Sequence, residues 1–129
     1  MFTKKEIEYL NAQRLARLAT VASDGQPDVV PVGYEFDGAA FFIGGRDVKK
    51  TRKVKNVRAG HEKVALVVDT LESVDPWRPR GIRVYGVAAL VEHEGRLGQG
   101  TYLQIRPEVS WSWNVEKPSV HKTVHAEAS

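Results

Sequence analysis

Short apolar segments separated by tight turns account for most of the chain. They cover residues 15–22, 28–36, 39–43, 63–70, 81–92, 101–106 and 110–115. Residues 63–70 (KVALVVDT) form a nearly continuous apolar run, which is typical of a buried strand. Asp24-Gly25 and Asp37-Gly38 have the composition of hairpin turns. The pattern therefore predicts six or seven short strands joined largely by tight turns.

Two segments have the signals of short helices. The first begins after Thr3, which can form a capping box with Glu6, and extends to about residue 13. The second is a basic segment in which apolar residues recur at helical spacing until Ala59-Gly60 ends the pattern. Many short strands and few helices predict a mainly β fold with short helices, arranged as a small antiparallel barrel.

The remaining segments have the composition of turns and irregular structure. Residues 71–81, which contain two prolines, predict a surface loop, and residues 93–95 predict a turn. Pro107 is expected to separate two short strands. Near the C-terminus no periodic pattern is found, so we expect one domain over residues 1–117 and a flexible tail over residues 118–129.

Composition narrows the class of protein. With 129 residues, of which 42% are hydrophobic and 27% charged, the chain has the size and composition of one globular domain. It contains no cysteine, which excludes disulfides, thiolate zinc sites and cysteine nucleophiles. No apolar run approaches the length of a membrane span, and the first ten residues carry charges where a signal peptide is apolar. We therefore expect a cytoplasmic protein without a membrane partner.

The positive charge is concentrated in one segment. The formal net charge is +3, but residues 46–58 hold seven basic residues and one acidic residue, a local balance of +6. The rest of the chain is therefore at −3. This distribution indicates a localised anion site, and a solvated helix face is the alternative that charge alone leaves open.

Motifs for several other chemistries are missing or incomplete. The glycines of residues 95–100 (GRLGQG) lack the strand–helix context of a dinucleotide fingerprint. His121 and His125 have the spacing of metal ligands on a helix, but no third ligand accompanies them, so no metal is expected. The sequence also lacks a G-x-S-x-G nucleophile elbow and a P-loop motif.

A phosphate site is the remaining candidate. Gly44-Gly45-Arg46 and the following basic residues 49–52 combine flexible backbone, long cations and a hydroxyl between a predicted strand and a predicted helix. Backbone N–H groups at a helix start, with Lys and Arg, commonly bind phosphate. Trp77, Tyr34 and Tyr85 could supply flat surfaces, although such residues are more often part of a core or an interface.

These motifs resemble a known family. LATVASDGQPDVVPVGYEFDG, IGGR, KKTRKVKNV, KVALVVD and PWRPRGIRVYGVAAL, with the later IRPE and WSW, are similar to pyridoxamine 5′-phosphate oxidase-like split-barrel proteins. The likeness is strongest to the small actinobacterial subgroup of coenzyme F420-dependent oxidoreductases. It covers residues 1–115 approximately. The resemblance implies a homodimeric, FMN-binding split antiparallel β-barrel, with the cofactor in a groove between subunits.

The resemblance also implies site residues. Lys50 and Thr51, with Arg46 or Arg52, would hold the cofactor phosphate. Residues that line the ring through their backbone would be Val30, Pro31, Val32, Gly33, Ile43 and Gly44. Trp77 would close the pocket, in one reading from the other subunit. The chain departs from true pyridoxamine phosphate oxidases because neither His121 nor His125 follows an arginine two residues earlier.

The function expected from these observations is hydride transfer between a flavin-like ring and a small conjugated acceptor. Coenzyme F420 is preferred over FMN because its acidic oligoglutamate tail would give Lys49, Lys53 and Lys55 a partner. No catalytic residue is assigned; Tyr34 and Tyr85 are candidate proton donors. The alternatives are a single-stranded nucleic-acid-binding barrel and a cofactor-binding barrel without catalysis. The first is disfavoured because residues 46–58 contain no aromatic residue, so no nucleic-acid partner is expected.

Three tryptophans favour a homodimer. Trp77, Trp111 and Trp113 offer more aromatic surface than a small core readily buries, and aromatic residues are enriched at interfaces. The alternative is that these side chains plug the ends of the barrel.

Overall fold

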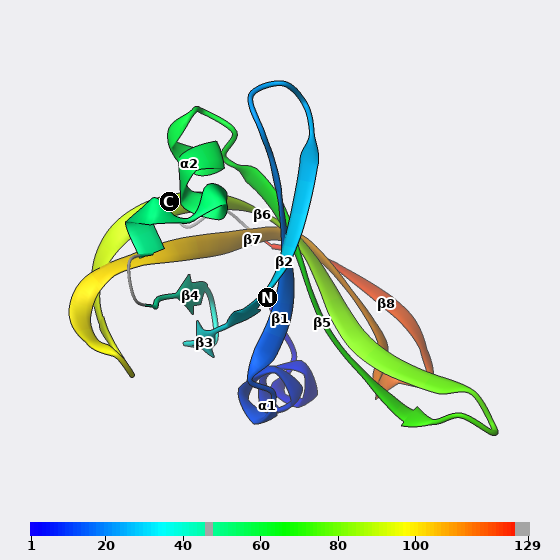
Figure 1. Ribbon diagram of the computed structural model, residues 1–129. Helices are drawn as coiled ribbons and strands as arrows, with labels where there is room; N and C mark the ends of the chain where they lie inside the picture. The colour runs from blue at the N-terminus through cyan, green and yellow to red at the C-terminus, as the bar shows by residue number, and fades with distance from the viewer. Residues whose placement is uncertain (46–47, 126–129) are drawn as a thin grey trace.

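One antiparallel sheet of eight strands makes up most of the protein. The computed structural model describes residues 1–45 and 48–125. Along the sheet the order is β2-β1-β5-β6-β7-β4-β3, and β8 pairs with the remaining part of β7. The strands are β1 (Leu15–Val21), β2 (Pro27–Gly33), β3 (Glu35–Phe36), β4 (Phe41–Ile43), β5 (Lys63–Ser73), β6 (Arg78–Gly95), β7 (Gly98–Lys117) and β8 (Ser119–Val124). The sheet curls into a split barrel (Figure 1), which confirms the predicted mainly β fold.

The barrel closes where the chain crosses from one sheet edge to the other. β2 and β3 lie at opposite ends of the strand order, yet Tyr34 alone separates them along the chain. Tyr34 is buried, and its hydroxyl donates a hydrogen bond of 2.7 Å to the carbonyl oxygen of Leu10. Burial raises the pKa of the Tyr34 hydroxyl. This residue therefore fixes the crossing and also joins it to the first helix.

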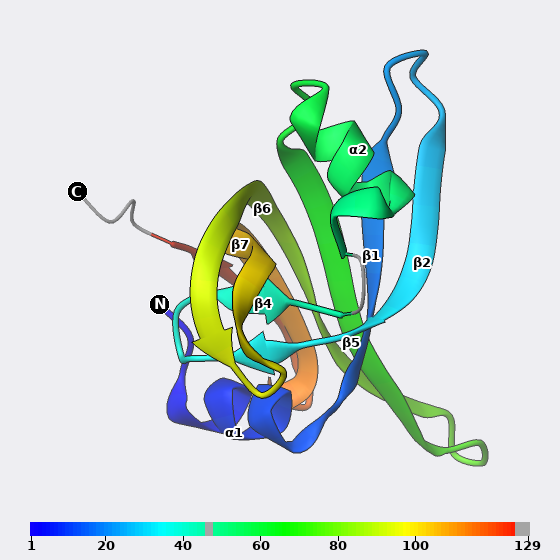
Figure 2. The same cartoon turned by 60° about the vertical axis from the view of Figure 1, so that its left-hand side comes forward.

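Two helices cover the ends of the barrel. α1 (Lys4–Ala12) lies at the lower end in Figure 2, and its capping box of Thr3 and Glu6 confirms the prediction. The 3₁₀ turn η1 (Val48–Lys50) and α2 (Arg52–Arg58) lie at the other end. As expected, α2 stops before Gly60, which adopts a φ of 97°. Neither helix is long and apolar enough to cross a membrane, nor is any other helical segment of residues 1–45 and 48–125.

A buried side-chain hydrogen bond anchors α2 to the barrel. Asn56 Nδ2 donates to Thr20 Oγ1 over 2.8 Å, and both side chains are buried. The neighbouring Val54 and Val57 are also buried. Asn56 therefore sets how the basic helix sits over β1.

The predicted loop at residues 71–81 is wrong. β5 continues to Ser73 and β6 begins at Arg78, with Leu71 paired opposite Pro79. The pairing between β6 and β7 begins at Gly81, and Pro79 precedes this residue. The missing N–H of Pro79 therefore interrupts no hydrogen bond between β6 and β7, so the proline is tolerated. The two strands form a long hairpin that projects from the barrel (Figure 1).

Two further breaks were expected where the structure has continuous strands. Pro107 lies within β7, opposite Gly86 at a bulge, and a bulge accommodates proline in a sheet. The turn predicted at residues 93–95 is displaced, because β6 reaches Gly95 and pairs there with Gly98.

The C-terminal segment contains regular structure that the sequence analysis did not expect. β8 pairs with β7, with Lys122 opposite Trp111 and His121 opposite Ser112. His125 Nε2 lies 2.8 Å from the Ser110 hydroxyl. Within the segment expected to be a flexible tail, residues 119–124 therefore form a strand, and residues 126–129 lie outside the described part of the chain.

Replacing Asn56 tests the anchoring of α2. We expect Asn56→Ala to lower the free energy of unfolding by about 1–3 kcal/mol, because Thr20 keeps a buried hydroxyl without its partner. Urea unfolding followed by circular dichroism measures the change. Asn11→Ala, at an exposed position of α1, is the control and should change the value by less than about 0.5 kcal/mol. Equal effects of the two substitutions would contradict the anchoring role.

Candidate functional site

The predicted ring-lining residues of β2 lie on a free sheet edge. β2 pairs only with β1, so the backbone groups on its other side are open within the described sheet. Pro31 and Gly33 are exposed, whereas the Val32 side chain is buried in the core and only its backbone can face a ligand. The edge therefore offers backbone groups and little side-chain chemistry.

Ile43 and Gly44 differ in what they can offer. The Ile43 side chain is fully inside the core. At Gly44 an added Cβ would lie 2.5 Å from the ring of Tyr102, so a glycine is needed for the tyrosine to pack there. Through these two residues, too, a ligand could be contacted only by backbone.

A hollow borders the basic segment. Its volume is ≈ 290 Å³, and it is lined by Gly45, Val48, Lys49, Lys50 and Thr101. Lys50 is exposed, so its ammonium can move into this space. The Thr51 hydroxyl donates to the Val48 carbonyl oxygen over 2.6 Å, so its proton is directed to the backbone. Arg52 is exposed on α2, and the predicted phosphate ligand Arg46 lies outside the described residues.

Lys53 was predicted to be a partner of the acidic cofactor tail, and it was not among the predicted phosphate ligands. It is half-buried on α2, and burial lowers the pKa of its ammonium, an effect that nearby Asp28 partly offsets. Asp28 belongs to β2 and pairs with Thr20, the partner of Asn56. Lys53 therefore lies beside β2. Helical spacing could have indicated this, since Lys53 stands three and four residues before the buried Asn56 and Val57.

Trp77 is not brought to the other candidates within one chain. It lies in the turn of the β5–β6 hairpin and is 68% exposed. Figures 1 and 2 both show this hairpin end away from α2 and the β1–β2 turn. Trp77 could therefore reach a site at α2 only from another copy of the chain.

One face of the sheet carries a continuous row of apolar residues beside a row that contains cations. Register places six apolar residues in one row across β8, β7, β6, β5, β1 and β2: Val124, Val109, Tyr85, Ala65, Ala19 and Val29. Of these, Tyr85 is 47% exposed and Val29 66%. The next row holds Trp111 and Val67 together with the cations Lys122, Arg83 and Arg17. The Arg83 guanidinium lies 4.3 Å from the centre of the Trp111 ring. We call these two rows, from Val124 to Val29 and from Lys122 to Arg17, the outer face.

The described side chains offer few groups for chemistry of their own. Ser110 and His125 form a contact of the kind used by nucleophile and base, but Ser110 is 1% exposed and closed to a substrate. In residues 1–45 and 48–125 no three His, Asp or Glu side chains gather as metal ligands would. The features that remain are cations beside an open backbone edge, an arrangement suited to holding an anionic cofactor.

Comparison with known proteins bears on the family of the chain. The family model described as pyridoxamine 5′-phosphate oxidase matches residues 2–114. A 5a,11a-dehydrotetracycline/5a,11a-dehydrooxytetracycline reductase of Streptomyces rimosus is 38% identical over 121 residues, covering 89% of this chain and 84% of the relative.

Solved structures share the fold at lower identity. A conserved hypothetical protein of Mycobacterium tuberculosis has a TM-score of 0.71 at 22% identity, covering 100% of this chain and 96% of that one. A protein titled F420 reductase has a TM-score of 0.65 at 20% identity, covering 84% and 98%. Both support the split-barrel architecture.

The partial burial of Lys53 leads to a prediction about the stability of the folded state. The folded state disfavours the charged form of Lys53. This residue therefore lowers the free energy of unfolding of the cofactor-free protein at neutral pH. Lys53→Met should therefore raise the urea midpoint at pH 7. The gain should shrink as the pH rises through the lowered pKa of Lys53, where the wild-type side chain becomes neutral.

Lys55→Met is the matched control, since Lys55 is exposed on the same helix. Its midpoint should stay close to that of the wild type. A lower urea midpoint for Lys53→Met than for Lys55→Met would show that the charge of Lys53 does not destabilise the folded state.

Proposed function

The chain belongs to the pyridoxamine 5′-phosphate oxidase family, and from this premise we propose that it is an oxidoreductase. Its cofactor would be a flavin or deazaflavin, bound between α2 and the edge of β2. The observation that carries the proposal is Lys53, a half-buried cation held beside that edge. The reductase relative, 38% identical over most of both chains, supports the reaction class.

The residues present fit the phosphate of such a cofactor. Lys53 has lost part of its hydration, so an anion would restore favourable interactions that water no longer supplies. Lys50 borders the adjoining hollow and Arg52 begins α2. These three cations would hold the phosphate, and the Thr51 hydroxyl oxygen remains able to accept or, after rotation, to donate.

The edge of β2 would orient the ring. Open backbone groups between Pro31 and Gly33 can hydrogen-bond the polar edge of a flat heterocycle. When bound, such a ring would supply hydride chemistry. The protein holds the acceptor against the ring and excludes water, which lowers the barrier by orientation rather than by a nucleophile.

The proton that accompanies the hydride would not come from Tyr34. Its hydroxyl is buried, bound to the Leu10 carbonyl oxygen, and its pKa is raised. Tyr85 lies on the outer face and is accessible in a single chain. We therefore assign this proton to no side chain of residues 1–45 and 48–125.

Coenzyme F420 is our preferred cofactor over FMN. Both carry a phosphate, but F420 continues into an acidic oligoglutamate tail. α2 presents more cations than one phosphate needs, because Lys55 and Arg58 are exposed beyond Lys53. This surplus of charge suits the longer anion.

A second copy of the chain would cover the outer face. Monomeric proteins rarely expose a contiguous apolar surface of this kind, and the row from Val124 to Val29 spans about 24 Å at the usual strand spacing. That width suits a standard interface, which buries about 800 Å² per partner. A homodimer would also allow Trp77 of one copy to approach the cofactor of the other.

Titration with each cofactor tests the proposed function. We expect F420 to bind with micromolar affinity and more tightly than FMN, and the reduced cofactor to be consumed when a conjugated carbonyl compound is added. Lys53→Ala should weaken binding by about tenfold to a hundredfold, because a charge-assisted hydrogen bond contributes roughly 1.5–3 kcal/mol. Absorbance and fluorescence of the cofactor measure both steps.

Two further variants complete this test. Lys50→Ala examines the lysine assigned from the family resemblance, and Lys5→Ala, on α1 at the far end of the barrel, is the control. Wild-type protein that binds neither cofactor would refute the proposal. Equal affinities of Lys53→Ala, Lys50→Ala and Lys5→Ala would place the phosphate elsewhere.

The dimer has its own test. Tyr85→Glu introduces a charge at the centre of the outer face and should shift the protein from dimer to monomer at tens of micromolar in light scattering. Leu97→Glu changes an exposed leucine at the tip of the β6–β7 hairpin and should leave the dimer intact. A monomeric wild-type protein at this concentration would contradict the dimer.

A further inference from the structure

We infer that His125 and Phe2 form a proton-sensitive latch, which holds the end of β8 against the barrel and opens when the His125 imidazole is protonated. His125 follows β8 directly, and Phe2 precedes α1. The centres of the two rings lie 4.3 Å apart, and the ring planes are inclined by 45°. This contact joins two segments that are far apart in the sequence, so it depends on the folded barrel.

Two hydrogen bonds attach His125 to β7. Its backbone N–H donates to the Glu108 carbonyl oxygen over 2.8 Å, and its Nε2 lies 2.8 Å from the Ser110 hydroxyl oxygen. Ser110 is buried, so an imidazole that moves away leaves this hydroxyl without its partner. The neutral imidazole therefore stabilises the closed latch.

Phe2 carries the contact into the hydrophobic core. It is buried and packs edge-on against Phe36 and Phe41, with ring centres 5.3 and 6.3 Å away. The Phe41 ring lies 5.7 Å from the ring of Tyr34, which fixes the crossing between β2 and β3. Displacing Phe2 would remove aromatic contacts from this cluster. The latch is thus connected by direct contacts to the residue that closes the barrel.

The surroundings of the imidazole disfavour its charged form. Burial and the positive amino group of Met1 lower the pKa of His125, and the carboxylate of Glu6 on α1 partly offsets this effect. Glu6 is itself buried, and its Oε1 accepts a hydrogen bond of 2.9 Å from the Thr3 N–H. Protonation of His125 in the closed latch is therefore unfavourable.

The acidic side chains of β7 are directed elsewhere. Glu108 contacts His125 through its backbone, and its side chain is exposed. The carboxylate of Glu116 accepts a hydrogen bond of 2.6 Å from the Thr3 hydroxyl. Neither carboxylate is in place to pair with a cationic imidazole.

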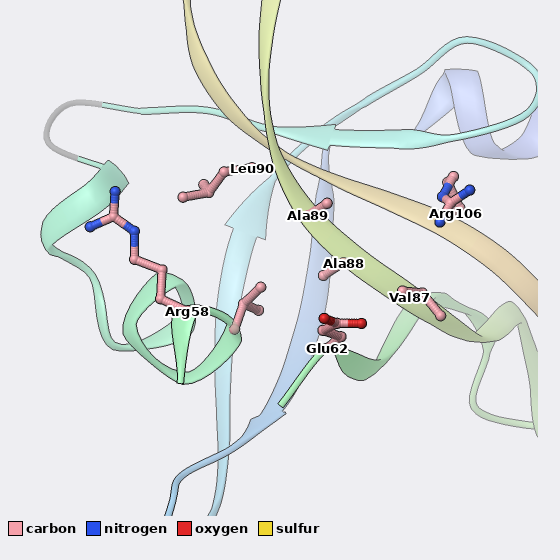
Figure 3. A pocket seen from close by; sticks show the side chains of 8 residues that line it. Arg58, Glu62, Val87, Ala88, Ala89, Leu90 and Arg106 are labelled. Carbon is pink, nitrogen blue, oxygen red and sulfur yellow. The ribbon is translucent and has the colours of Figure 1, made fainter. Parts of the chain in front are cut away.

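Two cations of β7 and β8 lie on the other side of the sheet. Lys122 belongs to the outer face. Arg106 pairs with Val87, and Figure 3 shows both among the residues that line a cavity of ≈ 310 Å³. Val87 stands three positions from Val84, the buried partner of Ser110, so it lies on the opposite face of β6. Neither cation therefore faces the imidazole.

The pH range of opening follows from these contacts. In a released segment the imidazole is solvated and titrates near its ordinary pKa of 6.5, whereas in the closed latch its pKa is lower. The released state therefore binds more protons at mildly acidic pH. The stability of the closed latch is complete above the ordinary pKa and is lost as the pH falls through the lowered one.

Hydrogen exchange of the β8 amides, followed by NMR and corrected for intrinsic exchange rates, measures this release. From about pH 7.5 to about pH 5 we expect their protection to fall about 3- to 10-fold relative to the amides of β5, which lies between β1 and β6. His125→Phe keeps an aromatic ring beside Phe2 but cannot be protonated. Its β8 protection should change by less than about twofold over the same range.

His121→Phe is the matched control, because it removes the other histidine of the C-terminal segment and leaves the latch intact. It should lose β8 protection on acidification as the wild type does. The latch involves no cofactor, so the cofactor-free protein serves for every measurement. Equal losses of protection in wild type and His125→Phe would refute the latch.

The titration of the His125 imidazole gives a second readout, which does not require the His125→Phe variant to fold. In the wild type it should titrate below pH 6.5. Phe2→Ala removes the ring that covers the imidazole, so the pKa of His125 should rise toward its ordinary value and the acid-induced loss of β8 protection should shrink. A wild-type His125 that titrates at or above pH 6.5, or one that Phe2→Ala leaves unchanged, would contradict the inference.

Discussion

The crossing at Tyr34 is the constraint on which the rest of the structure depends. With no other residue between β2 and β3, the chain must pass from one edge of the sheet to the other within a few ångströms. The buried Tyr34 hydroxyl, bound to the Leu10 carbonyl oxygen, holds that passage against α1. The barrel is thus drawn together at one place, and β2 keeps an open edge beside α2. The candidate cofactor site lies at that opening.

The long strands have two apolar faces, which a monomer does not need. β6 and β7 supply the core on one side through Ile82, Val84 and Ile105, and they present Tyr85 and Trp111 on the other. Burying the second face gains hydrophobic free energy only if another surface covers it. The architecture therefore couples the proposed dimer to the sheet that forms the core. A change on the outer face can affect assembly without disturbing the interior.

Local signals in the sequence predicted local features well. The capping box and the turns at Gly25 and Gly38 depend on neighbouring residues, and the structure confirms them. Pro79 and Pro107 led to wrong predictions of a loop and of a strand break. The effect of a proline depends on whether its missing N–H faces a paired strand or a bulge, and the local sequence does not determine this. The strand β8 was missed for the same reason, since its pairing with β7 is not encoded by its own periodicity.

Lys53 shows why site prediction is harder than fold prediction. The sequence identified the basic segment, but charge alone does not distinguish a solvated lysine from one pressed against β2. That distinction depends on the phase of α2, which the Asn56–Thr20 hydrogen bond fixes. A cation that is partly desolvated in the ligand-free protein lowers the stability of the folded state. An anion bound beside this cation would restore that stability. If the proposed phosphate binds there, the contact that orients α2 would thus favour the bound state over the empty one.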